Sequence, residues 1–390
     1  MSDENKLKVG IIGVGNIGGA HASAVYGGEI EHMCLAALCD CDPEKAAELR
    51  RKYPDIPVFE SARELFDSGL AQAVIIATPH YYHPPIAVEA FRRGLHVLTE
   101  KPAGVDCKSA GEMCRAAKES GKTFGVMFNQ RANKLFSEAR RMILAGELGE
   151  LKRVVWIITN WYRKQSYYDS GSWRATWAGE GGGVLLNQAP HNLDLWQWIC
   201  GMPKALRAEC KVAKFHDIEV EDEACIQAEY ENGATAVFIT STGDYPGTNR
   251  LEITGTGGKM VLENHKLTFH KLSMDEREFR MTSADVKNPV QIIEIEDERY
   301  NGHCVILENF ASAVLFGTPL LAPGEDALCE LSISNAAYLS AWQDKKITLP
   351  ADEDAFLDEL EKRKKASVLK NPDGESLGTG SYADRWNTNW

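Results

Sequence analysis

Two side chains in this 390-residue sequence could act together on one reacting oxygen. Lys101 lies in the tripeptide Glu-Lys-Pro at 100–102, and His191 lies in a glycine-led segment at 181–194. An imidazole with a pKa near ~6.5 can accept a proton at neutral pH. An ammonium group can stabilise a developing oxyanion by roughly 3 kcal/mol. Each residue alone has an ordinary alternative, an exposed lysine or a hydrogen-bonded core histidine, so the elements that position them decide between the two.

A glycine-rich turn near the start of the sequence predicts a dinucleotide site. A short apolar run is followed by Gly13-x-Gly15-x-x-Gly18, and the next apolar run, 33–39, ends at Asp40. Gly13 permits a tight turn, Gly15 lets the backbone approach a pyrophosphate, and Gly18 lets the following helix pack closely. Asp40 can accept hydrogen bonds from the ribose hydroxyls of adenosine and would repel a 2′-phosphate, so NAD is favoured over NADP. The alternative is an ordinary strand-to-helix turn.

Composition and charge exclude several classes of protein. Hydrophobic residues make up 44% and charged residues 25% of the chain, as in soluble globular proteins with room here for two domains. A net charge of −13 argues against nucleic acid as a partner. The polar residues 1–8 do not resemble a signal peptide, and a long uncharged stretch, 71–88, holds three prolines, so we expect no membrane span and a cytoplasmic protein. Ten cysteines without a Cys-x-x-Cys pair indicate reduced thiols and no metal site.

The order of predicted elements indicates two kinds of architecture. The first third alternates strands and helices, which predicts an α/β domain with a doubly wound parallel sheet. The strands are expected at 8–12, 33–39, 58–59, 73–77, 96–99 and 123–128, and the helices at 17–26, 43–52, 62–67, 84–93 and 108–120.

After about residue 129 consecutive strands are joined by turns, such as the hairpin signal Asn232-Gly233, which predicts an α+β domain with a mostly antiparallel sheet. The expected strands are 152–161, 207–212, 224–230, 234–242, 250–254, 259–262 and 267–270, and the expected helices are 134–145, 185–199, 304–315, 326–342 and 355–365. We expect a dinucleotide-binding domain at 1–129, a substrate and oligomerisation domain at 130–350, and an arm at 351–390. Tyr382, Trp386 and Trp390 in that arm are expected to dock on the chain's own body, with a neighbouring subunit or a site as alternatives.

Three polar segments would meet where ligands bind. Thr-Pro-His-Tyr-Tyr-His-Pro at 78–84 and Glu-Lys-Pro at 100–102 follow strands of the parallel sheet, and 181–194 opens a helix of the second domain. In an open α/β sheet the ligand crevice lies beyond the carboxyl ends of the strands. With Asn129 at the crossover between domains, the predicted cofactor contacts are Gly13, Gly15, Asn16, Ile17, Gly18, Asp40, Thr78, His83, Glu100, Lys101 and Asn129.

The combined pattern resembles the glucose–fructose oxidoreductase/inositol dehydrogenase/MocA (Gfo/Idh/MocA) family over about residues 6–350. The resemblance is carried by residues 13–18, Asp40, 78–84, 100–102, 181–194 and 322–350. It implies a Rossmann domain, a second domain with a large open sheet used for subunit association, and hence a homodimer or homotetramer. It also implies NAD(P)-linked chemistry at a secondary carbinol of a sugar or cyclitol, with Lys101 beside the nicotinamide and the reacting oxygen. The family also implies a cis bond before Pro102.

One position departs from the inositol-type members, which carry an Asp-x-x-x-His pair. His191 matches the histidine, but Asn187 stands at the aspartate position. An amide can donate and accept hydrogen bonds, but it cannot take a proton or hold a negative charge. We therefore expect Asn187 to orient a substrate hydroxyl, and His191 and Lys101 to be the catalytic residues.

An aromatic segment at 161–177 could form a platform for a sugar ring. Aromatic faces stack on the C–H faces of pyranose rings, and arginine binds hydroxyls or a carboxylate; domain packing is the alternative reading of these aromatics. The predicted substrate contacts are Tyr168, Trp173, Arg174, Asn187 and His191.

Three functions fit this sequence. The first is an NAD-dependent dehydrogenase of a sugar, glycoside or cyclitol, with C3 of a hexopyranoside preferred. The second is a glycosidase of the same family that oxidises its substrate transiently and regenerates NAD. The third is a non-catalytic NAD- or sugar-sensing regulator, which the presence of both Lys101 and His191 disfavours because a sensor needs no proton transfer.

Overall fold

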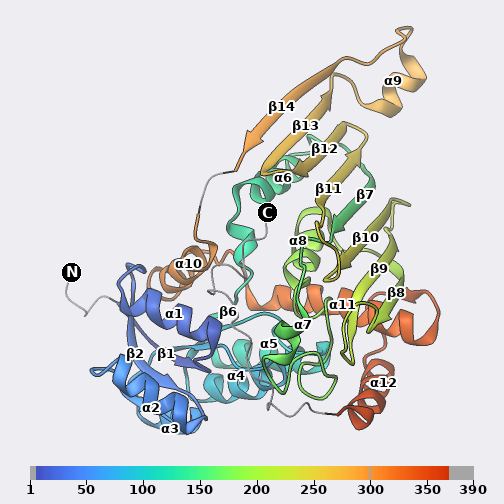
Figure 1. Ribbon diagram of the computed structural model, residues 1–390. Coiled ribbons are helices and arrows are strands. Elements are labelled where there is room, and N and C mark those ends of the chain that lie inside the picture. Colours follow the sequence, from blue (N-terminus) through green and yellow to red (C-terminus); the bar gives the residue numbers. More distant parts are fainter. Residues whose placement is uncertain (1–5, 298–299, 369–390) are drawn as a thin grey trace. The chain divides into compact units, whose positions relative to one another are not determined.

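The computed structural model describes residues 6–297 and 300–368, and the chain divides into two compact units (Figure 1). Unit 1 comprises Met1–Ala132 and Asn301–Leu331, and unit 2 comprises Asn133–Tyr300 and Ser332–Trp390. The three aromatic residues predicted to dock the C-terminal arm lie outside the described residues. Within the described ranges, none of the helices combines the length and the apolar character that crossing a bilayer requires.

Unit 1 contains the predicted parallel sheet. Its six strands lie in the order β3-β2-β1-β4-β5-β6, and every neighbouring pair is parallel. The strands are β1 (Leu7–Ile12), β2 (Met33–Cys39), β3 (Val58–Phe59), β4 (Ala73–Ile76), β5 (His96–Thr99) and β6 (Phe124–Val126). This is the strand order of a doubly wound dinucleotide-binding fold, in which ligands bind beyond the carboxyl ends of the strands.

Helices connect these strands, and several begin at side chains that the sequence marks as caps. Asp42, Ser61 and Asp106 accept hydrogen bonds from the first-turn N–H groups of α2, α3 and α5. The helices of this part are α1 (Asn16–Tyr26), α2 (Pro43–Lys52), α3 (Ala62–Asp67), α4 (His83–Arg92) and α5 (Cys107–Ser120), with short 3-10 turns at η2 (His80–Tyr82) and η3 (Asn129–Ala132).

A later helix, α10 (Gly302–Phe316), also belongs to unit 1. Its buried face, Ile306, Leu307 and Phe310, packs in the same apolar core as the parallel sheet. The compact units therefore differ from the division at 129 and 350 that the sequence suggests. The chain leaves unit 1, forms most of unit 2 and returns, because the apolar face of α10 is buried in the first core.

Unit 2 is built on a nine-stranded sheet in the order β14-β13-β12-β11-β7-β10-β9-β8-β15. All neighbouring strands are antiparallel except β7 and β10, which confirms the expected mostly antiparallel sheet. The strands are β7 (Leu151–Ile158), β8 (Ala205–Val212), β9 (Glu221–Glu229), β10 (Thr235–Ser241), β11 (Asn249–Gly255), β12 (Gly258–Glu263), β13 (Lys266–Leu272), β14 (Val290–Glu296) and β15 (Ile347–Thr348).

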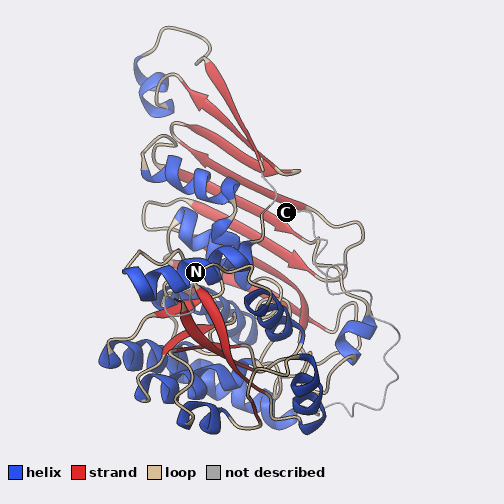
Figure 2. Cartoon of the chain, turned by 90° about the vertical axis from the view of Figure 1, so that its left-hand side faces the viewer, coloured by secondary structure: helices blue, strands red, loops and turns tan. Residues whose placement is uncertain are grey.

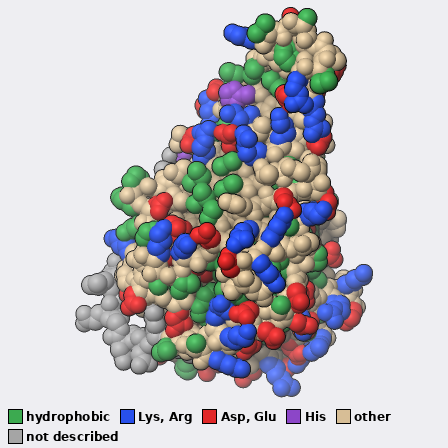
Figure 3. Space-filling view, turned by 90° about the vertical axis from the view of Figure 1, so that its right-hand side faces the viewer, with side chains coloured by type: hydrophobic (Ala, Val, Ile, Leu, Met, Phe, Trp, Pro, Cys, Tyr) green, Lys and Arg blue, Asp and Glu red, His purple; other side chains and the backbone are tan. Residues whose placement is uncertain are grey.

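Two helices, α6 (Lys134–Leu144) and α8 (Pro190–Cys200), pack on one face of this sheet (Figure 2). The ring of Trp196 stacks on Phe238 of β10 with centroids 5.7 Å apart, and Phe136 lies against Trp156 of β7. Strands and helix are thus joined by aromatic contacts, which bury large apolar areas. On the face shown in Figure 3, Lys and Arg side chains are interspersed with Asp and Glu side chains. Lys266 and Glu294 form an ion pair between β13 and β14.

The C-terminal part of unit 2 is held by a stack of rings. Phe356 of α12 (Glu353–Ala366) stacks on Trp342 of α11 (Ala327–Gln343), with centroids 5.4 Å apart, and the Arg363 guanidinium lies 4.0 Å from the same Trp342 ring. The first helix of the predicted arm is therefore an integral part of unit 2.

The start of α8 corrects one prediction. A helix was expected from Leu185, but α8 begins at Pro190. The preceding residues form turns instead, because the N–H of Asn187 donates to Gly183 O and the N–H of Ala189 donates to Val184 O. Two other short helices, α7 (Gln165–Asp169) and α9 (Glu276–Thr282), were not expected.

Candidate active site

The three glycines of the first turn have two different tasks. A Cβ on Gly13 would lie 2.8 Å from Ala77 O, and its φ of +84° is in the left-handed region. A Cβ on Gly18 would lie 1.9 Å from Gly13 O, so backbone atoms leave no room for a side chain at Gly13 or at Gly18. Gly15 has no atom within 4 Å of the added Cβ. Gly13 and Gly18 therefore serve the fold, whereas Gly15 faces open space through which a pyrophosphate can reach the backbone.

Helix α1, which contains Asn16 and Ile17, begins directly after this turn and presents an anion-binding end. It has no acidic residue in its first turn and no side-chain cap at Gly15. The first N–H groups of a helix have no partner within the helix and carry a partial positive charge, which suits a phosphate.

Asp40 stands at the tip of β2 and is bonded to the same turn. Its Oδ2 accepts from Val14 N–H at 2.8 Å and its Oδ1 accepts from Asp42 N–H at 3.1 Å. A carboxylate offers about four acceptor positions, so these two bonds orient Asp40 and leave capacity for ribose hydroxyls.

Three buried oxygens near the carboxyl ends of β4, β5 and β6 fit a bound cofactor. Within the described residues, Thr78 Oγ1, Thr99 Oγ1 and Asn129 Oδ1 are inaccessible to solvent and have no hydrogen-bond partner. Buried polar atoms are almost always paired in proteins, so such a group calls for a ligand or water. Thr78 and Asn129 were predicted cofactor contacts from sequence, whereas Thr99 was not. The residues present therefore fit a dinucleotide in this place.

His83, a predicted cofactor contact, joins two loops of unit 1. Its ring is buried, with Nδ1 2.8 Å from Pro102 O and Nε2 2.7 Å from Thr78 O. Both ring nitrogens thus face backbone carbonyls, to which a neutral ring can donate only one hydrogen bond. Burial lowers the pKa of this histidine against the raising effect of the two carbonyls. His83 ties the loop after β4 to the loop that carries Lys101, and the Lys101–Pro102 bond in that loop is cis, as the family resemblance implies.

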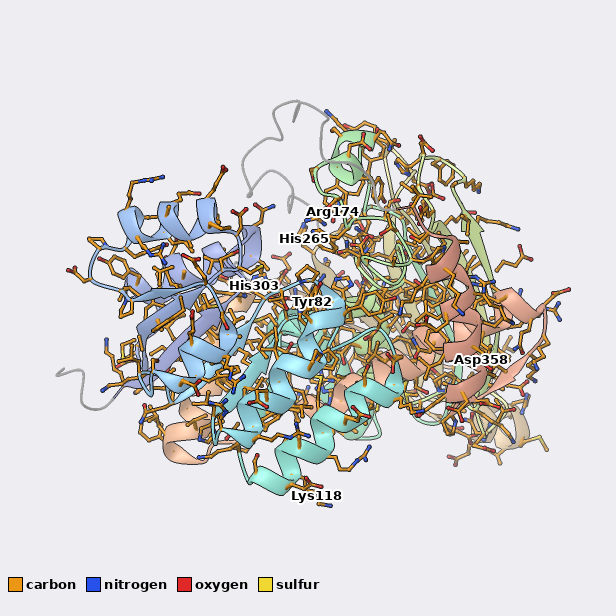
Figure 4. All side chains as sticks on the ribbon, turned by 90° about the horizontal axis from the view of Figure 1, so that it is seen from below. Tyr82, Lys118, Arg174, His265, His303 and Asp358 are labelled. Atoms are coloured by element: carbon orange, nitrogen blue, oxygen red, sulfur yellow. The ribbon has the colours of Figure 1, made fainter. Side chains whose placement is uncertain are left out.

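Glu100 takes part in a buried cluster that includes two histidines not predicted from sequence. Its Oε1 lies 2.7 Å from His21 Nε2, and the His303 ring lies 5.7 Å from the His21 ring. The Nδ1 atom of His303, a residue labelled in Figure 4, lies 3.4 Å from Asn129 Nδ2.

The charges of this cluster are set by burial and by the histidine contact. Burial raises the pKa of Glu100, but the hydrogen bond from His21, with further help from His303 and Lys101, outweighs it and holds the pKa at about 2. Burial lowers the pKa of His303 to about 4. Glu100 is therefore an ionised group paired inside unit 1, next in the chain to Lys101.

In unit 2, the glycine segment 181–183 is packed against a buried carboxyl group. Glu221 accepts from Gly183 N–H at 3.0 Å, from Leu185 N–H at 2.9 Å and from Tyr338 Oη–H at 2.7 Å. A Cβ on Gly183 would lie 1.9 Å from Glu221 O, and one on Gly182 would lie 2.2 Å from Tyr338 Oη. Glycine is therefore required here by close approach within the protein. Burial raises the pKa of Glu221 to about 7, against the lowering effect of these donors.

The chain that follows leads to a polar cluster around Asn187. The Asn187 Nδ2 donates to Glu180 Oε1 and, at 3.2 Å, to Tyr167 Oη. Arg174, labelled in Figure 4, donates to the same Tyr167 oxygen at 2.9 Å, and its guanidinium lies 4.6 Å from the centre of the Trp173 ring. The predicted substrate residues Arg174 and Asn187 are thus joined through Tyr167, and Trp173 is joined to them through its contact with Arg174.

Glu180 is a member of this cluster that was not predicted, and no short-range pattern in the sequence marks it. His191 lies in the first turn of α8, four residues after Asn187, and is buried.

Tyr168 packs against this cluster, with its ring edge-on to Tyr167 at a centroid distance of 5.2 Å. Its Oη is 2.8 Å from Thr242 Oγ1, its ring packs edge-on against His216, and the side chain is buried. Burial also raises the pKa of this phenol well above its ordinary value. These contacts hold Tyr168 within unit 2, and the hydroxyl beside Asn187 is that of Tyr167. A substrate contact of Tyr168 stays a prediction.

A Rossmann-type sheet with a phosphate-binding turn, followed by a second domain with a large mixed sheet, defines a two-domain dinucleotide-binding oxidoreductase. Comparison with protein families agrees. Residues 7–128 match the family described as oxidoreductase family, NAD-binding Rossmann fold, and residues 136–261 match the GFO/IDH/MocA C-terminal domain. The chain belongs to the Gfo/Idh/MocA oxidoreductase family.

Individual relatives are distant but cover most of the chain. The scyllo-inositol 2-dehydrogenase (NAD(+)) of Bacillus subtilis is 23% identical over 348 residues, which cover 86% of this chain and 94% of that protein. The levoglucosan dehydrogenase of Pseudarthrobacter phenanthrenivorans is 25% identical over 322 residues, 73% of this chain and 81% of that protein. The WlbA dehydrogenase from Bordetella pertussis, crystallised with NADH and UDP-GlcNAcA, is 25% identical with a TM-score of 0.75 and covers 89% of this chain and 100% of its own. This chain is an NAD-binding oxidoreductase of a family that contains sugar and cyclitol dehydrogenases.

Proposed function

We propose that this protein transfers a hydride between NAD and the carbinol carbon of a secondary hydroxyl in a sugar, glycoside or cyclitol, with C3 of a hexopyranoside as the preferred position. The observation that carries this proposal is the cluster of Tyr167, Arg174 and Asn187, which lies just before His191 in the chain. Such a cluster offers the donors and acceptors that recognise several hydroxyl groups. The relatives that act on inositol, levoglucosan and a nucleotide sugar support the same class of substrate.

Two residues carry the proposed chemistry. NAD, held by the turn at 13–18 and Asp40, supplies the two-electron acceptor. In this proposal His191 accepts the hydroxyl proton, and the Lys101 ammonium stabilises the developing alkoxide. The carbinol loses its O–H proton to His191 and its C–H hydride to the nicotinamide, so the products are a ketone and NADH. Hydride leaves only as the proton departs, so the reaction requires a proton acceptor as well as the nicotinamide.

The proposed cellular form is a cytoplasmic homodimer or homotetramer joined through the sheet of unit 2. The edge strand β14 supports this proposal, because Val290 and Ile292 expose 52% and 60% of their surface in the single chain. Exposed apolar side chains on an edge strand are commonly covered by a partner.

The test is to incubate the purified protein with NAD⁺ and a panel of myo-inositol, scyllo-inositol, methyl glucosides and levoglucosan, and to follow NADH absorbance. At least one compound should be oxidised, and Lys101→Ala and His191→Ala should each lower kcat/KM by roughly 10²–10⁴-fold. Lys118→Ala, an exposed lysine of unit 1 (Figure 4), is the matched control and should leave turnover unchanged.

Other outcomes point to the alternative functions. No NADH from any compound overturns the dehydrogenase proposal. Release of the aglycone from a glycoside without net NADH, by protein purified with bound NAD, identifies the redox-neutral glycosidase. If the cellular role survives both Lys101→Ala and His191→Ala, the protein is a non-catalytic sensor.

A further inference from the structure

The amide of Asn187 is bonded to a buried carboxylate from its own unit. Glu180 is 1% exposed; its Oε1 accepts from Asn187 Nδ2, and its Oε2 accepts from Ala175 N–H at 2.6 Å. An ionised carboxylate has only acceptor positions, so the NH₂ end of the amide must face Glu180. The contact therefore fixes which end of Asn187 points away from Glu180, and that end is the carbonyl oxygen Oδ1.

The same contact changes the strength of that oxygen. A hydrogen bond to an ionised acceptor is stronger than one to a neutral group, and hydrogen bonds in a chain polarise one another. Donation from Nδ2 to Glu180 shifts electron density in the amide toward Oδ1 and makes it a better acceptor. Asn187 itself cannot hold a negative charge, and Glu180, its hydrogen-bond partner, supplies that charge instead.

We propose that Glu180 is a positioning residue that holds Asn187 with Oδ1 toward the substrate, so that this site selects a substrate group that donates a hydrogen bond, a free hydroxyl. The inference rests on the proposed function, since the hydroxyl belongs to the sugar or cyclitol. It makes the pair Glu180–Asn187 the equivalent of a single aspartate. All three residues of the argument, Ala175 included, lie in unit 2.

The proposal predicts the effect of exchanging acid and amide. In Glu180→Gln, Ala175 N–H still requires an acceptor, so the glutamine oxygen faces Ala175 and its NH₂ faces Asn187. The Asn187 amide must then turn over, which directs its NH₂ toward the substrate and leaves the proton of the substrate hydroxyl without its acceptor at position 187. We expect KM for a hydroxyl substrate to rise and kcat/KM to fall by roughly 30-fold, the effect of leaving a buried polar group unpaired.

The reverse change places two carboxylates in contact. In Asn187→Asp, both carboxylates cannot remain ionised in a buried site, so the pKa of one must rise. A raised carboxyl pKa in the folded state makes stability fall as the pH rises, because the unfolded chain releases that proton first. In the double variant Glu180→Gln/Asn187→Asp, the glutamine NH₂ donates to the new aspartate while its oxygen still accepts from Ala175. We expect this variant to regain kcat/KM to within about 3-fold of the natural protein.

The experiment compares the natural protein, the two single variants and the double variant by three measurements. These are kcat/KM and KM with the best compound of the panel, NADH affinity by fluorescence titration, and the midpoint of thermal unfolding at about pH 5.5 and about pH 8.5. Glu223→Gln, which removes a partly exposed carboxylate paired with Lys214 in the same unit, is the matched control and should change none of them appreciably. NADH affinity should stay within about 2-fold in every variant, since all changes lie in unit 2.

Rescue by the double variant supports the proposal, and it cannot arise if Glu180 only braces its loop. Losses that multiply in the double variant overturn the proposal while leaving the dehydrogenase activity established. If no compound is oxidised, the proposed function fails, but the unfolding data still show whether Glu180 and Asn187 interact. A pH-dependent loss in Asn187→Asp that Glu180→Gln removes supports the contact, and independent effects overturn it.

Discussion

The molecule contains two glycine-rich turns that are similar in sequence but differ in the groups that accept hydrogen bonds from their N–H groups. The turn at 13–18 leads into α1 with no acidic side chain at the helix start. The turn at 181–183 is closed by the protein itself, because Glu221 accepts from the N–H of Gly183 and of Leu185. An anion from outside suits the first turn, whereas the second already holds a carboxyl group.

The glycines themselves show the same difference. A Cβ would lie 1.9 Å from a carbonyl oxygen at both Gly18 and Gly183, so each turn has one glycine that packing demands. Gly15 alone faces open space among Gly13, Gly15, Gly18, Gly182 and Gly183 of the two turns. A glycine-rich turn therefore indicates that another group comes close to the backbone. Whether this group is a ligand or part of the protein depends on where the fold places acidic side chains.

The largest expected effect is that of Gly183→Ala. The added methyl would overlap Glu221 O, which is backbone and cannot rotate away, so we expect unit 2 to lose about 4 kcal/mol of unfolding free energy. Every tryptophan among the described residues lies in unit 2, so tryptophan fluorescence during denaturant unfolding measures this loss. NADH affinity, measured separately, should change by less than about 2-fold.

Gly111→Ala is the matched control for this variant. Gly111 lies within α5 with no atom within 4 Å of an added Cβ, so alanine should be neutral or slightly stabilising there. If Gly183→Ala unfolds like the natural protein but loses NADH affinity, then the second turn is a cofactor site and the comparison is wrong.

The next effect concerns the carboxyl group that closes the second turn. Burial raises the pKa of Glu221 to about 7, against roughly 4.3 in an unfolded chain. Between these values the unfolded state releases its proton first, so the stability contribution is complete below about pH 4 and is lost as the pH rises toward 7. The loss amounts to about 3 kcal/mol for the whole range.

Glu221→Gln removes this dependence, because glutamine keeps one oxygen for Gly183 N–H and Leu185 N–H and does not ionise. Tryptophan-monitored unfolding at about pH 5 and about pH 8 should show a smaller difference in the variant than in the natural protein. Glu223→Gln, on the same strand, should show the same dependence of the free energy of unfolding on pH as the natural protein. An unchanged slope in Glu221→Gln would mean that another group dominates the pH response of unit 2.

Much of the fold could be predicted because its signals are local. The strand Met33–Cys39 is an apolar run that ends at an acid, and α2 begins where Asp42 and Pro43 provide a cap and a first residue. The start of α8 could not be predicted. Leu185 and Leu186 continue the apolar pattern of the helix, whereas the turn that they form depends on a hydrogen bond from Leu185 N–H to Glu221. Edge strand β14 pairs only with β13, and its exposure left no buried face to detect.

The site could be predicted only where its residues belong to one short motif. Glycines, Asp40, Thr78 and Asn129 follow strand ends in a known order. The pair His21–Glu100 joins residues 79 positions apart, and Glu221 lies 38 positions from Gly183. No local pattern connects such residues, because the fold alone brings them together. Tyr168 shows the converse case, where an aromatic in a promising segment turns inward to Thr242.

The smallest of these effects on the fold, and the most specific for the first turn, is that of Gly15→Ala. The methyl would enter space that contains no protein atom within 4 Å, so folding should change by less than about 1 kcal/mol. The same methyl would stand where the backbone must approach the pyrophosphate, so NADH affinity should fall by roughly 30-fold, about 2 kcal/mol. Fluorescence titration with NADH measures the affinity, and circular dichroism during thermal unfolding measures the fold. Gly18→Ala should instead damage both, because its Cβ would meet Gly13 O. Equal NADH affinity in Gly15→Ala and the natural protein would show that the open space at this turn does not receive the cofactor, and the distinction between a ligand turn and a packing turn would be lost.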